Sequence, residues 1–270
     1  TIMEVITRIW DVSPELEVIV CSDGSTDQTA QLARAAGAIV VEHPYNVGNG
    51  AAIKSGTIRS TREYIVFMDA DLQHPPEDIP KLLTYLPEYD MVVGARTSDS
   101  QTATHRNIGN KILIKVAESI SHYKIDDLTS GFRAVKKQKF TQFMHLYPLS
   151  YSYPTTSTLA FFCSGHFVKY VPLPSIRMRT HGESNLRPLR DGMKFVHIIL
   201  RSIMTFHPQK VFTPLAIFVF LSGMMLSGYQ LLYTGGIRSS GIILLISAII
   251  IYLNGTLVEQ IAQLRRELYK

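Results

Sequence analysis

The sequence predicts an α/β fold with a mainly parallel sheet and covering helices, followed by two transmembrane helices that form a C-terminal hairpin. Short β-like runs alternate with helix-like segments over residues 1–182, which is the pattern of parallel strands joined by crossover helices. Two long uncharged segments follow near the C-terminus. Acidic and glycine-rich residues stand where the strands of the first part end, and open α/β sheets bind ligands at that edge.

The elements of the first part follow in order. The chain begins at Thr1 within a helix. Ser25 and Gln28 have the spacing of a capping box, which predicts a helix from there to Ala36. Another helix is expected over 51–60, after a glycine-rich loop. Four strands are expected, at residues 16–21, 38–42, 64–68 and 91–94.

Near the C-terminus, segments 211–233 and 241–258 carry no charged side chain. A helix needs roughly 20 apolar residues to cross a bilayer, so we expect spans over about 211–233 and 241–262, within a hairpin unit 211–263 that precedes a basic tail, 264–270. Basic side chains flank the pair on both sides: Arg187, Arg190, Lys194, Arg201 and Lys210 before it, and Arg265, Arg266 and Lys270 after it.

By the positive-inside rule, these flanks place both ends of the hairpin, and with them the N-terminal domain, in the cytosol. The membrane would be a bacterial or archaeal plasma membrane or the ER membrane. The alternative is a buried helical hairpin of a soluble protein. Between the two parts, residues 183–210 form a linker in which 191–206 is amphipathic, and this helix either lies at the lipid interface or covers the sheet.

Composition agrees with one α/β domain and an appendage. The 270 residues are 46% hydrophobic and 18% charged, which is enough for a substantial core. The formal net charge of +5 is compatible with nucleic acid, anionic lipid or diphosphate partners. The two cysteines, Cys21 and Cys163, stand in apolar runs, so neither a disulfide framework nor a cysteine metal site is expected.

An acidic pair marks the end of the third expected strand. Asp69 and Asp71 stand two residues apart, with Gln73 two further on, and their oxygen atoms suit a hard divalent cation, Mg²⁺ or Mn²⁺, better than zinc. Such an ion would bridge two phosphates and neutralise a leaving group. The alternative is that Asp71 caps a helix that begins near Pro75.

Two glycine-containing segments follow the first two strands. In 23–27, Asp23 can accept a hydrogen bond from a base or ribose, while Gly24 allows close backbone approach; the alternative is an Asx-type turn with a helix cap. The pair Gly48 and Gly50 is not the dinucleotide-binding fingerprint, because Ile53 stands where the last glycine or alanine is required.

Taken together, these segments resemble one family, the GT-A glycosyltransferases of family 2. Within it they are similar to the polyprenyl-phosphate hexose transferases, a group that includes dolichol-phosphate mannose synthase and bacterial lipid-linked glucosyl and aminoarabinosyl transferases. The matching residues are 22–27, 46–52, 69–77, 94–96 and 127–133, and their order and spacing agree over nearly the whole chain, including the C-terminal pair of spans.

The resemblance implies roles for individual residues. Asp23 and Asp69 would bind the nucleotide, and the ligands of a required Mg²⁺ or Mn²⁺ would be Asp69, Asp71 and Gln73. Catalytic roles fall on Asp71, Asp127 and Arg133. Five residues would gather the acceptor phosphate, namely Arg96, Ser130 and Arg133, with Arg106 and Lys111 as further candidates.

Two of these assignments have alternatives. Arg133 could form a strand-edge salt bridge with Asp126 or Asp127. Asp127 could orient the acceptor, act as a weak base, or hold the Thr129–Ser130–Gly131 turn.

The resemblance also implies a reaction. A single hexose would pass, with inversion, from a UDP- or GDP-linked donor to undecaprenyl or dolichyl phosphate, in a membrane-bound enzyme that can form homo-oligomers such as tetramers and has no nucleic-acid partner. The sugar stays open. The alternatives are a processive polysaccharide synthase, whose Q-x-x-R-W motif is missing because the single tryptophan is Trp10, a sugar-phosphate nucleotidyltransferase, or an inactive membrane scaffold.

Two departures from the family pattern affect the donor site. Family members open with a strand and a loop that contribute to nucleotide binding, whereas this sequence starts in the helix that follows, so we expect the first strand to be missing from the printed residues. Asn49 stands where the family often has a basic residue, which weakens the case for a phosphate contact there.

Overall fold

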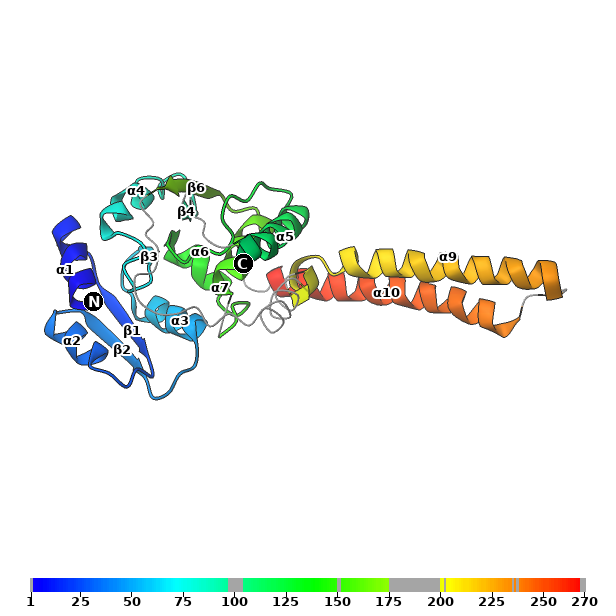
Figure 1. Cartoon of the computed structure of the whole chain (residues 1–270), viewed down its shortest axis with the longest axis horizontal. Helices are drawn as coiled ribbons and strands as arrows, with labels where there is room; N and C mark the ends of the chain where they lie inside the picture. The colour runs from blue at the N-terminus through cyan, green and yellow to red at the C-terminus, as the bar shows by residue number, and fades with distance from the viewer. Residues whose placement is uncertain are drawn as a thin grey trace. The chain divides into compact units, whose positions relative to one another are not determined.

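The computed structural model describes residues 2–96, 104–149, 152–174, 200–201, 203–234, 236 and 238–267, with the side chains of all of these except 104–112, 234 and 266. The chain divides into two compact units, Thr1–Phe195 and Val196–Lys270. The first unit holds all the strands of the described residues, and the second holds two long helices (Figure 1).

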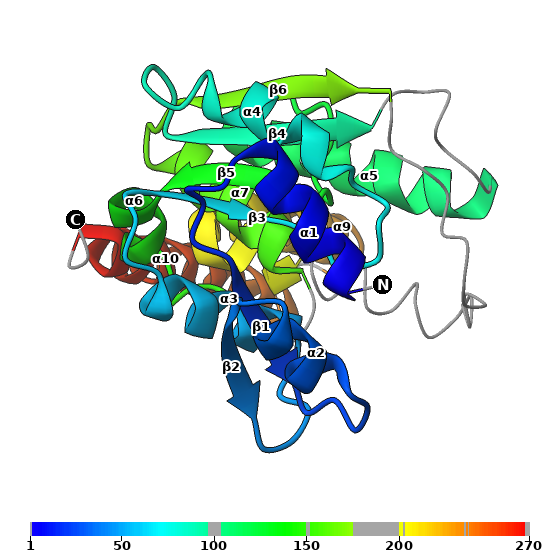
Figure 2. The same ribbon diagram turned by 90° about the vertical axis from the view of Figure 1, so that its left-hand side faces the viewer.

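The strands of the first unit form two sheets (Figure 2). In the smaller sheet, β1 (Ile19–Asp23) lies parallel to β2 (Ile39–His43). The larger sheet has the order β3-β5-β4-β6, with β3 at Tyr64–Phe67, β5 at Arg133–Lys136, β4 at Met91–Arg96 and β6 at Val168–Leu173. β4 and β6 are parallel, while β5 runs antiparallel to β3 and β4, so β5 is the one reversed strand of this sheet. The predicted α/β fold is confirmed, and β5 and β6 are additions to the four expected strands.

The helices of the first unit connect and cover these strands. In chain order they are α1 (Ile2–Val12), α2 (Thr29–Ala35), α3 (Asn49–Arg59), the short 3₁₀ helix η1 (Pro76–Asp78), α4 (Ile79–Leu83), α5 (Thr104–Ser121), α6 (Lys137–Gln142) and α7 (Tyr153–Cys163). Figure 1 shows α2 on one side of the β1–β2 ribbon and α3 on the other. On α5, the buried side chains Leu113, Ala117 and Ile120 form one stripe, in a helix that packs against α7.

One predicted helix start is wrong. The capping box at Ser25 does not form, because α2 begins only at Thr29, whose backbone N–H donates to Asp27 Oδ1 at 3.0 Å. A short carboxylate-bonded turn at Asp27 replaces the first helical turn. The alternative role of Asp71 as a helix cap is not observed: the helix near Pro75 forms as η1, while the Asp71 carboxylate accepts from the backbone N–H of Gln73 at 3.1 Å.

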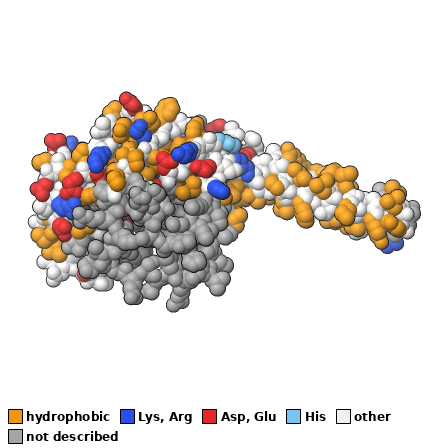
Figure 3. Space-filling model, turned by 45° about the horizontal axis from the view of Figure 1, so that its top comes forward, with side chains coloured by type: hydrophobic (Ala, Val, Ile, Leu, Met, Phe, Trp, Pro, Cys, Tyr) orange, Lys and Arg blue, Asp and Glu red, His pale blue; other side chains and the backbone are white. Residues whose placement is uncertain are grey.

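The second unit is a hairpin of α9 (Gln209–Thr234) and α10 (Ser239–Glu267), which run side by side (Figure 1). Both helices are long and apolar enough to cross a membrane, and only 17% of each apolar window is buried within the structure. Large apolar side chains therefore cover the outer surface of the hairpin, as Figure 3 shows. This exposed apolar surface agrees with a transmembrane hairpin better than with the buried helical pair of a soluble protein.

The inner seam of the hairpin is tightly packed. A Cβ atom at Gly255 would lie 2.4 Å from Cβ of Phe212, and one at Gly241 would lie 2.3 Å from Oγ of Ser227. At the open end, Glu259 accepts a hydrogen bond from the backbone N–H of Gln209 at 3.1 Å. That carboxylate therefore satisfies one of the N–H groups that a helix start leaves unpaired. The predicted linker helix, 191–206, lies mostly outside the described residues.

Candidate active site

Asp23, at the end of β1, organises the loop between β2 and α3. Its Oδ1 accepts from the backbone N–H of Val47 at 2.9 Å and lies 2.8 Å from Nδ1 of His43, and its Oδ2 accepts from the N–H of Gly48 at 2.7 Å. Nε2 of His43 lies 2.9 Å from Oγ of Ser55 on α3. Burial alone would raise the pKa of Asp23, but the hydrogen bonds of His43, Val47 and Gly48 outweigh it and lower this pKa.

The family pattern does not single out His43, yet this side chain holds Asp23 in place. It was missed because a histidine that ends a strand gives no sequence signal for a partner 20 residues away. The requirement for glycine at position 24 has a related structural cause. Its φ is +69°, and a Cβ atom there would lie 2.5 Å from the backbone N of Asn46, so only glycine fits. Asp23 is thus tied to one loop conformation.

The acidic turn, which we define as Asp69–Gln73, lies just after β3. Leu72, between Asp71 and Gln73, has a φ of +62°, a left-handed backbone conformation that is uncommon for a branched apolar residue. Asp69 is exposed and lies against Gly131, where an added Cβ would be 3.2 Å from Asp69 Oδ2. The acidic turn therefore contacts the loop 127–131 that precedes β5.

The donor atoms of this turn suit a hard cation. Two carboxylates and one amide supply only oxygen ligands, which is the chemistry of Mg²⁺ and Mn²⁺. Within the described residues, no three His, Cys, Asp or Glu side chains gather closely enough to form a metal cage. An ion held by one or two carboxylates commonly takes its remaining ligands from substrate phosphates and water, so Asp69, Asp71 and Gln73 fit such a shared site.

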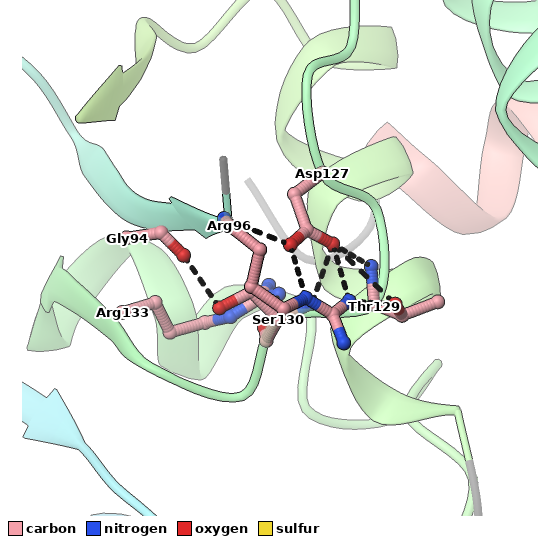
Figure 4. A network of polar contacts seen from close by, with 6 residues as sticks. All are labelled: Gly94, Arg96, Asp127, Thr129, Ser130 and Arg133. Atoms are coloured by element: carbon pink, nitrogen blue, oxygen red, sulfur yellow. Dashed lines mark hydrogen bonds and ion pairs between the residues drawn. The ribbon is translucent and has the colours of Figure 1, made fainter. Parts of the chain in front are cut away.

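Arg96, at the end of β4, forms a two-point ion pair with Asp127 (Figure 4). Nε donates to Oδ2 and Nη2 donates to Oδ1, both at 2.8 Å, and Nη2 also donates to the Thr129 hydroxyl at 2.6 Å. Nη1 has no partner among the described residues, and 27% of the Arg96 side chain is exposed. Asp127 therefore fixes the orientation of the Arg96 guanidinium, whose two Nη1 N–H groups can bind an anion.

Asp127 is 4% exposed, and every hydrogen bond that it makes is accepted. Its Oδ1 also accepts from the backbone N–H groups of Thr129 and Ser130, each at 3.1 Å. Burial would raise the pKa of this carboxyl, but the hydrogen bonds and charge of Arg96 outweigh burial and lower it. The same contact raises the pKa of Arg96. These contacts favour the interpretation of Asp127 as the group that orients Arg96 and holds the turn.

Ser130 and Arg133 make their hydrogen bonds to the protein interior. Ser130 donates its hydroxyl proton to the carbonyl oxygen of Gly94 at 2.6 Å, so that proton is already used. Arg133 is fully buried, and its Nη1 donates to the carbonyl oxygen of Pro154 at 3.0 Å and to the Ser157 hydroxyl at 2.7 Å. Nη2 donates to the carbonyl oxygen of Ser130.

These contacts favour structural roles for Ser130 and Arg133 in the protein interior, and their implied part in binding the acceptor phosphate stays a prediction. The alternative salt bridge of Arg133 is not observed: Asp127 pairs with Arg96, and Asp126 pairs with Lys124 at 3.3 Å. Burial lowers the pKa of Arg133. Of the other two candidates, Arg106 and Lys111 lie on α5, and their side chains are outside the described part of the chain.

Two further residues near the site were not predicted. His74 is 6% exposed and stacks on Phe132 with ring centroids 5.0 Å apart, next to the acidic turn. Tyr153, in the first turn of α7, donates its hydroxyl to the carbonyl oxygen of Gly131 at 3.2 Å. Both contacts fix the loop 127–132, and neither residue has a spacing in the sequence that would reveal its partner.

Solved structures share this architecture. Glucosyl-3-phosphoglycerate synthase from Mycobacterium tuberculosis, in complex with Mn²⁺, uridine diphosphate and phosphoglyceric acid, superposes with a TM-score of 0.59 over 75% of this chain and 72% of that protein, at 23% identity. At this identity the likeness shows the fold. The protein is a GT-A fold protein with a C-terminal helical hairpin.

The family follows from the sequence match. Residues 1–144 match the model of glycosyl transferase family 2, and residues 207–264 match that of the GtrB C-terminal hairpin. Since the first match covers more than half of the 270 residues, the chain belongs to glycosyl transferase family 2. The predicted family is confirmed.

The chain is also similar in sequence to two curated proteins. The dolichyl-phosphate hexose transferase of Haloferax volcanii is 34% identical over 136 residues, which are 49% of this chain and 58% of the relative. The undecaprenyl-phosphate 4-deoxy-4-formamido-L-arabinose transferase of Pectobacterium carotovorum is 27% identical over 140 residues, which are 50% of this chain and 43% of the relative. The chain spans about half the length of the curated relatives that it matches.

Proposed function

We propose that this chain transfers one sugar from a UDP- or GDP-linked donor to the phosphate of a polyprenyl lipid, with inversion at the anomeric carbon. One observation carries the proposal. The loop 127–131 touches the acidic turn through Gly131 and holds the Arg96 guanidinium through Asp127. A cation site and an anion-binding arginine therefore belong to one connected structure, as a donor diphosphate and an acceptor phosphate require.

The acidic turn would hold the donor. Asp69, Asp71 and Gln73 supply oxygen ligands for Mg²⁺ or Mn²⁺, and such an ion neutralises the charge of a departing nucleoside diphosphate. Asp23 would accept a hydrogen bond from the base or ribose, because three protein hydrogen bonds fix its orientation and its carboxylate keeps further acceptor capacity. Two relatives are named as transferases of dolichyl phosphate and undecaprenyl phosphate, and these names support a lipid acceptor.

The acceptor needs little activation. A phosphate monoester has its second pKa near ~6, so at neutral pH it is mostly a dianion and already nucleophilic. Arg96 would bind this dianion through Nη1, which has no partner in the described part of the chain, and direct one oxygen toward the anomeric carbon. Asp127 contributes by fixing Arg96, and its lowered pKa makes it a poor base.

The hairpin suits a lipid substrate because a polyprenyl tail stays in the bilayer. We place α9 and α10 across the plasma membrane or the ER membrane, with the N-terminal domain in the cytosol, and the basic residues that flank the hairpin support this orientation. Assembly into homo-oligomers, including tetramers, belongs to the same proposal.

The test is a panel of radiolabelled nucleotide sugars, each incubated with the full chain in detergent and a short polyprenyl phosphate, with and without Mn²⁺. A lipid-extractable product that carries one sugar and forms from one donor supports the proposal, and the NMR coupling at its anomeric carbon reports inversion. A product with many sugars would indicate a processive synthase. Failure of every donor to give a lipid product, with Mg²⁺ or Mn²⁺ present, would refute the proposal.

A further inference from the structure

Three protein hydrogen bonds converge on the Asp23 carboxylate. Oδ1 accepts from Nδ1 of His43 at 2.8 Å and from the backbone N–H of Val47 at 2.9 Å, while Oδ2 accepts from the N–H of Gly48 at 2.7 Å. Each carboxylate oxygen has two lone pairs in the plane of the group, which gives about four acceptor positions in all. Within the described residues, both positions on Oδ1 and one on Oδ2 are therefore filled, and one position on Oδ2 is left.

His43 donates to Asp23 in either protonation state of its ring. An ionised carboxylate only accepts hydrogen bonds, so the proton between Nδ1 and Oδ1 is assigned to Nδ1. On the other side of the ring, Nε2 lies 2.9 Å from the Ser55 hydroxyl on α3, which can donate to a neutral imidazole or accept from a charged one. The imidazole is therefore held between α3 and Asp23, and it fills an acceptor position of the carboxylate in both states.

Rotation of the carboxylate does not release a second position. A turn about the Cβ–Cγ bond only exchanges Oδ1 and Oδ2 among the same three donors. These donors belong to the last residue of β2, His43, and to the backbone of the loop that leads into α3. The Asp23 side chain is 17% exposed, so a ligand can still reach the remaining position.

The bases of UDP- and GDP-linked donors present different edges to such a carboxylate. Uracil has a single N–H, at N3, between two carbonyl groups. Guanine has two adjacent donors, N1–H and the 2-amino group, which a carboxylate with free lone pairs on both oxygens binds as a fork. With one acceptor position left, Asp23 can pair fully with uracil but leaves one guanine donor without a partner, which weakens binding.

We propose that His43 determines the base specificity of the donor site: by filling an acceptor position of Asp23, it makes the site select a UDP-linked donor over a GDP-linked donor. The proposal rests on the proposed function, in which Asp23 binds the base of the donor. His43 acts through Asp23, so it is a positioning residue and not a catalytic one.

A histidine that only supports the loop makes a different prediction. Its replacement would weaken the binding of every nucleotide by a similar factor. Removal of a histidine that fills an acceptor position frees a second position on Asp23, so the carboxylate can then accept from two donors. The ratio of the two affinities, rather than either affinity alone, therefore distinguishes the two roles.

The first experiment needs no substitution. Inosine diphosphate has the same purine ring system and N1–H as GDP but lacks the 2-amino group, so this pair differs in the number of donors and not in ring size. Calorimetric titration of the full chain in detergent with Mn²⁺ compares UDP, GDP and inosine diphosphate. We expect GDP to bind about tenfold or more weakly than UDP, and about tenfold more weakly than inosine diphosphate. Equal binding of GDP and inosine diphosphate would overturn the proposal.

Substitutions of His43 test the residue itself. His43→Phe keeps a ring of similar size but has no N–H for Asp23, so we expect the preference for UDP over GDP to fall by about fivefold or more. His43→Asn can place an amide N–H where Nδ1 lies, and it should keep the preference. His145→Phe, at an exposed position, is the matched control. Circular dichroism checks that each variant is folded, and an unchanged preference in folded His43→Phe would contradict the role of this residue.

The outcomes also separate base selection from sugar transfer. Tighter binding of GDP than of UDP by the parent chain overturns the base selection and leaves the proposed function standing. Selective binding of UDP, without a lipid-linked product from any donor, supports the base selection and refutes the proposed transfer. A chain that binds neither nucleotide with Mg²⁺ or Mn²⁺ present contradicts both.

Discussion

The Arg96 guanidinium and the Asp127 carboxylate meet through two hydrogen bonds of 2.8 Å, so the orientation of an exposed arginine is set by a carboxylate that is itself 4% exposed. The preceding residue in the chain provides a contrast. Asp126 pairs with Lys124 at 3.3 Å on the surface, with side chains 47% and 87% exposed. Neighbouring carboxylates thus form one buried and one exposed ion pair.

This contrast gives the first prediction. Asp127→Asn removes the charge that holds Arg96, and breaking a buried pair costs about 3 kcal/mol. We expect the free energy of unfolding to fall by that amount and the KM for polyprenyl phosphate to rise by about tenfold or more, with donor affinity unchanged. Denaturant unfolding and steady-state kinetics measure these quantities. Asp126→Asn is the control, and it should change stability by less than about 1 kcal/mol. Equal effects of the two substitutions would contradict the positioning role.

The pH dependence of stability follows from the lowered pKa values of Asp127, Asp23 and Asp90. A carboxyl whose pKa is lower in the folded chain than its unfolded value of about 3.9 stabilises the fold above that value. This contribution is lost as the pH falls through the folded pKa. We expect the free energy of unfolding to drop steeply below about pH 4, and the drop to be shallower in Asp127→Asn. An equally steep acid limb in the variant would argue against this assignment.

Asp71→Asn tests the cation site. The amide keeps the size of the side chain but weakens its binding to a divalent ion, so we expect metal-dependent sugar transfer to fall by about 100-fold or more. Membrane insertion and the thermal unfolding midpoint should stay the same. Asp11→Asn, at an exposed position of α1, is the matched control. Full transfer activity of the Asp71 variant would refute the role of this residue.

A substitution of Arg133 can distinguish a structural role of this residue from a role in substrate binding. Arg133→Met leaves the carbonyl oxygens of Ser130 and Pro154 without their donor, and unpaired buried acceptors cost about 1–3 kcal/mol each. For the two acceptors together we expect a loss of stability of about 2–6 kcal/mol, measured by denaturant unfolding, with an acceptor KM within about threefold of the parent. A large rise of acceptor KM at unchanged stability would instead restore the phosphate-binding role that the family resemblance implied.

Two glycines with similar backbone conformations give a matched pair. Gly24 and Gly165 have φ values of +69° and +75°, but a Cβ atom would meet backbone atoms of residues 45 and 46 at 2.5 Å in the first case and nothing within 4 Å in the second. Gly165→Ala should cost about 1 kcal/mol, for the left-handed backbone alone. Gly24→Ala should cost about 3 kcal/mol and weaken nucleotide binding, because the Asp23 loop must move. Thermal unfolding and nucleotide titration compare them, and equal losses would exclude the steric argument.

Much of the fold could be read from the residues. The strand around Val20, the acidic turn at Asp69 and the two apolar spans were predictable because strand periodicity, turn chemistry and the length of an uncharged run are local properties. Helix starts were predicted less well. Ser25 has the spacing of a cap, but Asp27 forms a competing turn, and the outcome depends on a balance between two hydrogen bonds of similar strength.

The sequence alone determined the family, the acidic turn and the apolar hairpin, because these depend on the order and type of residues along the chain. Only the tertiary structure decided that Asp127 holds Arg96, that Arg133 points into the interior beside α7, and that an open groove separates β1 from β3. The physical reason is that these features join residues 20 to 50 positions apart. Packing in three dimensions decides which of several nearby charges form an ion pair and which strand edges are paired. Such long-range contacts produce no periodic pattern in the sequence.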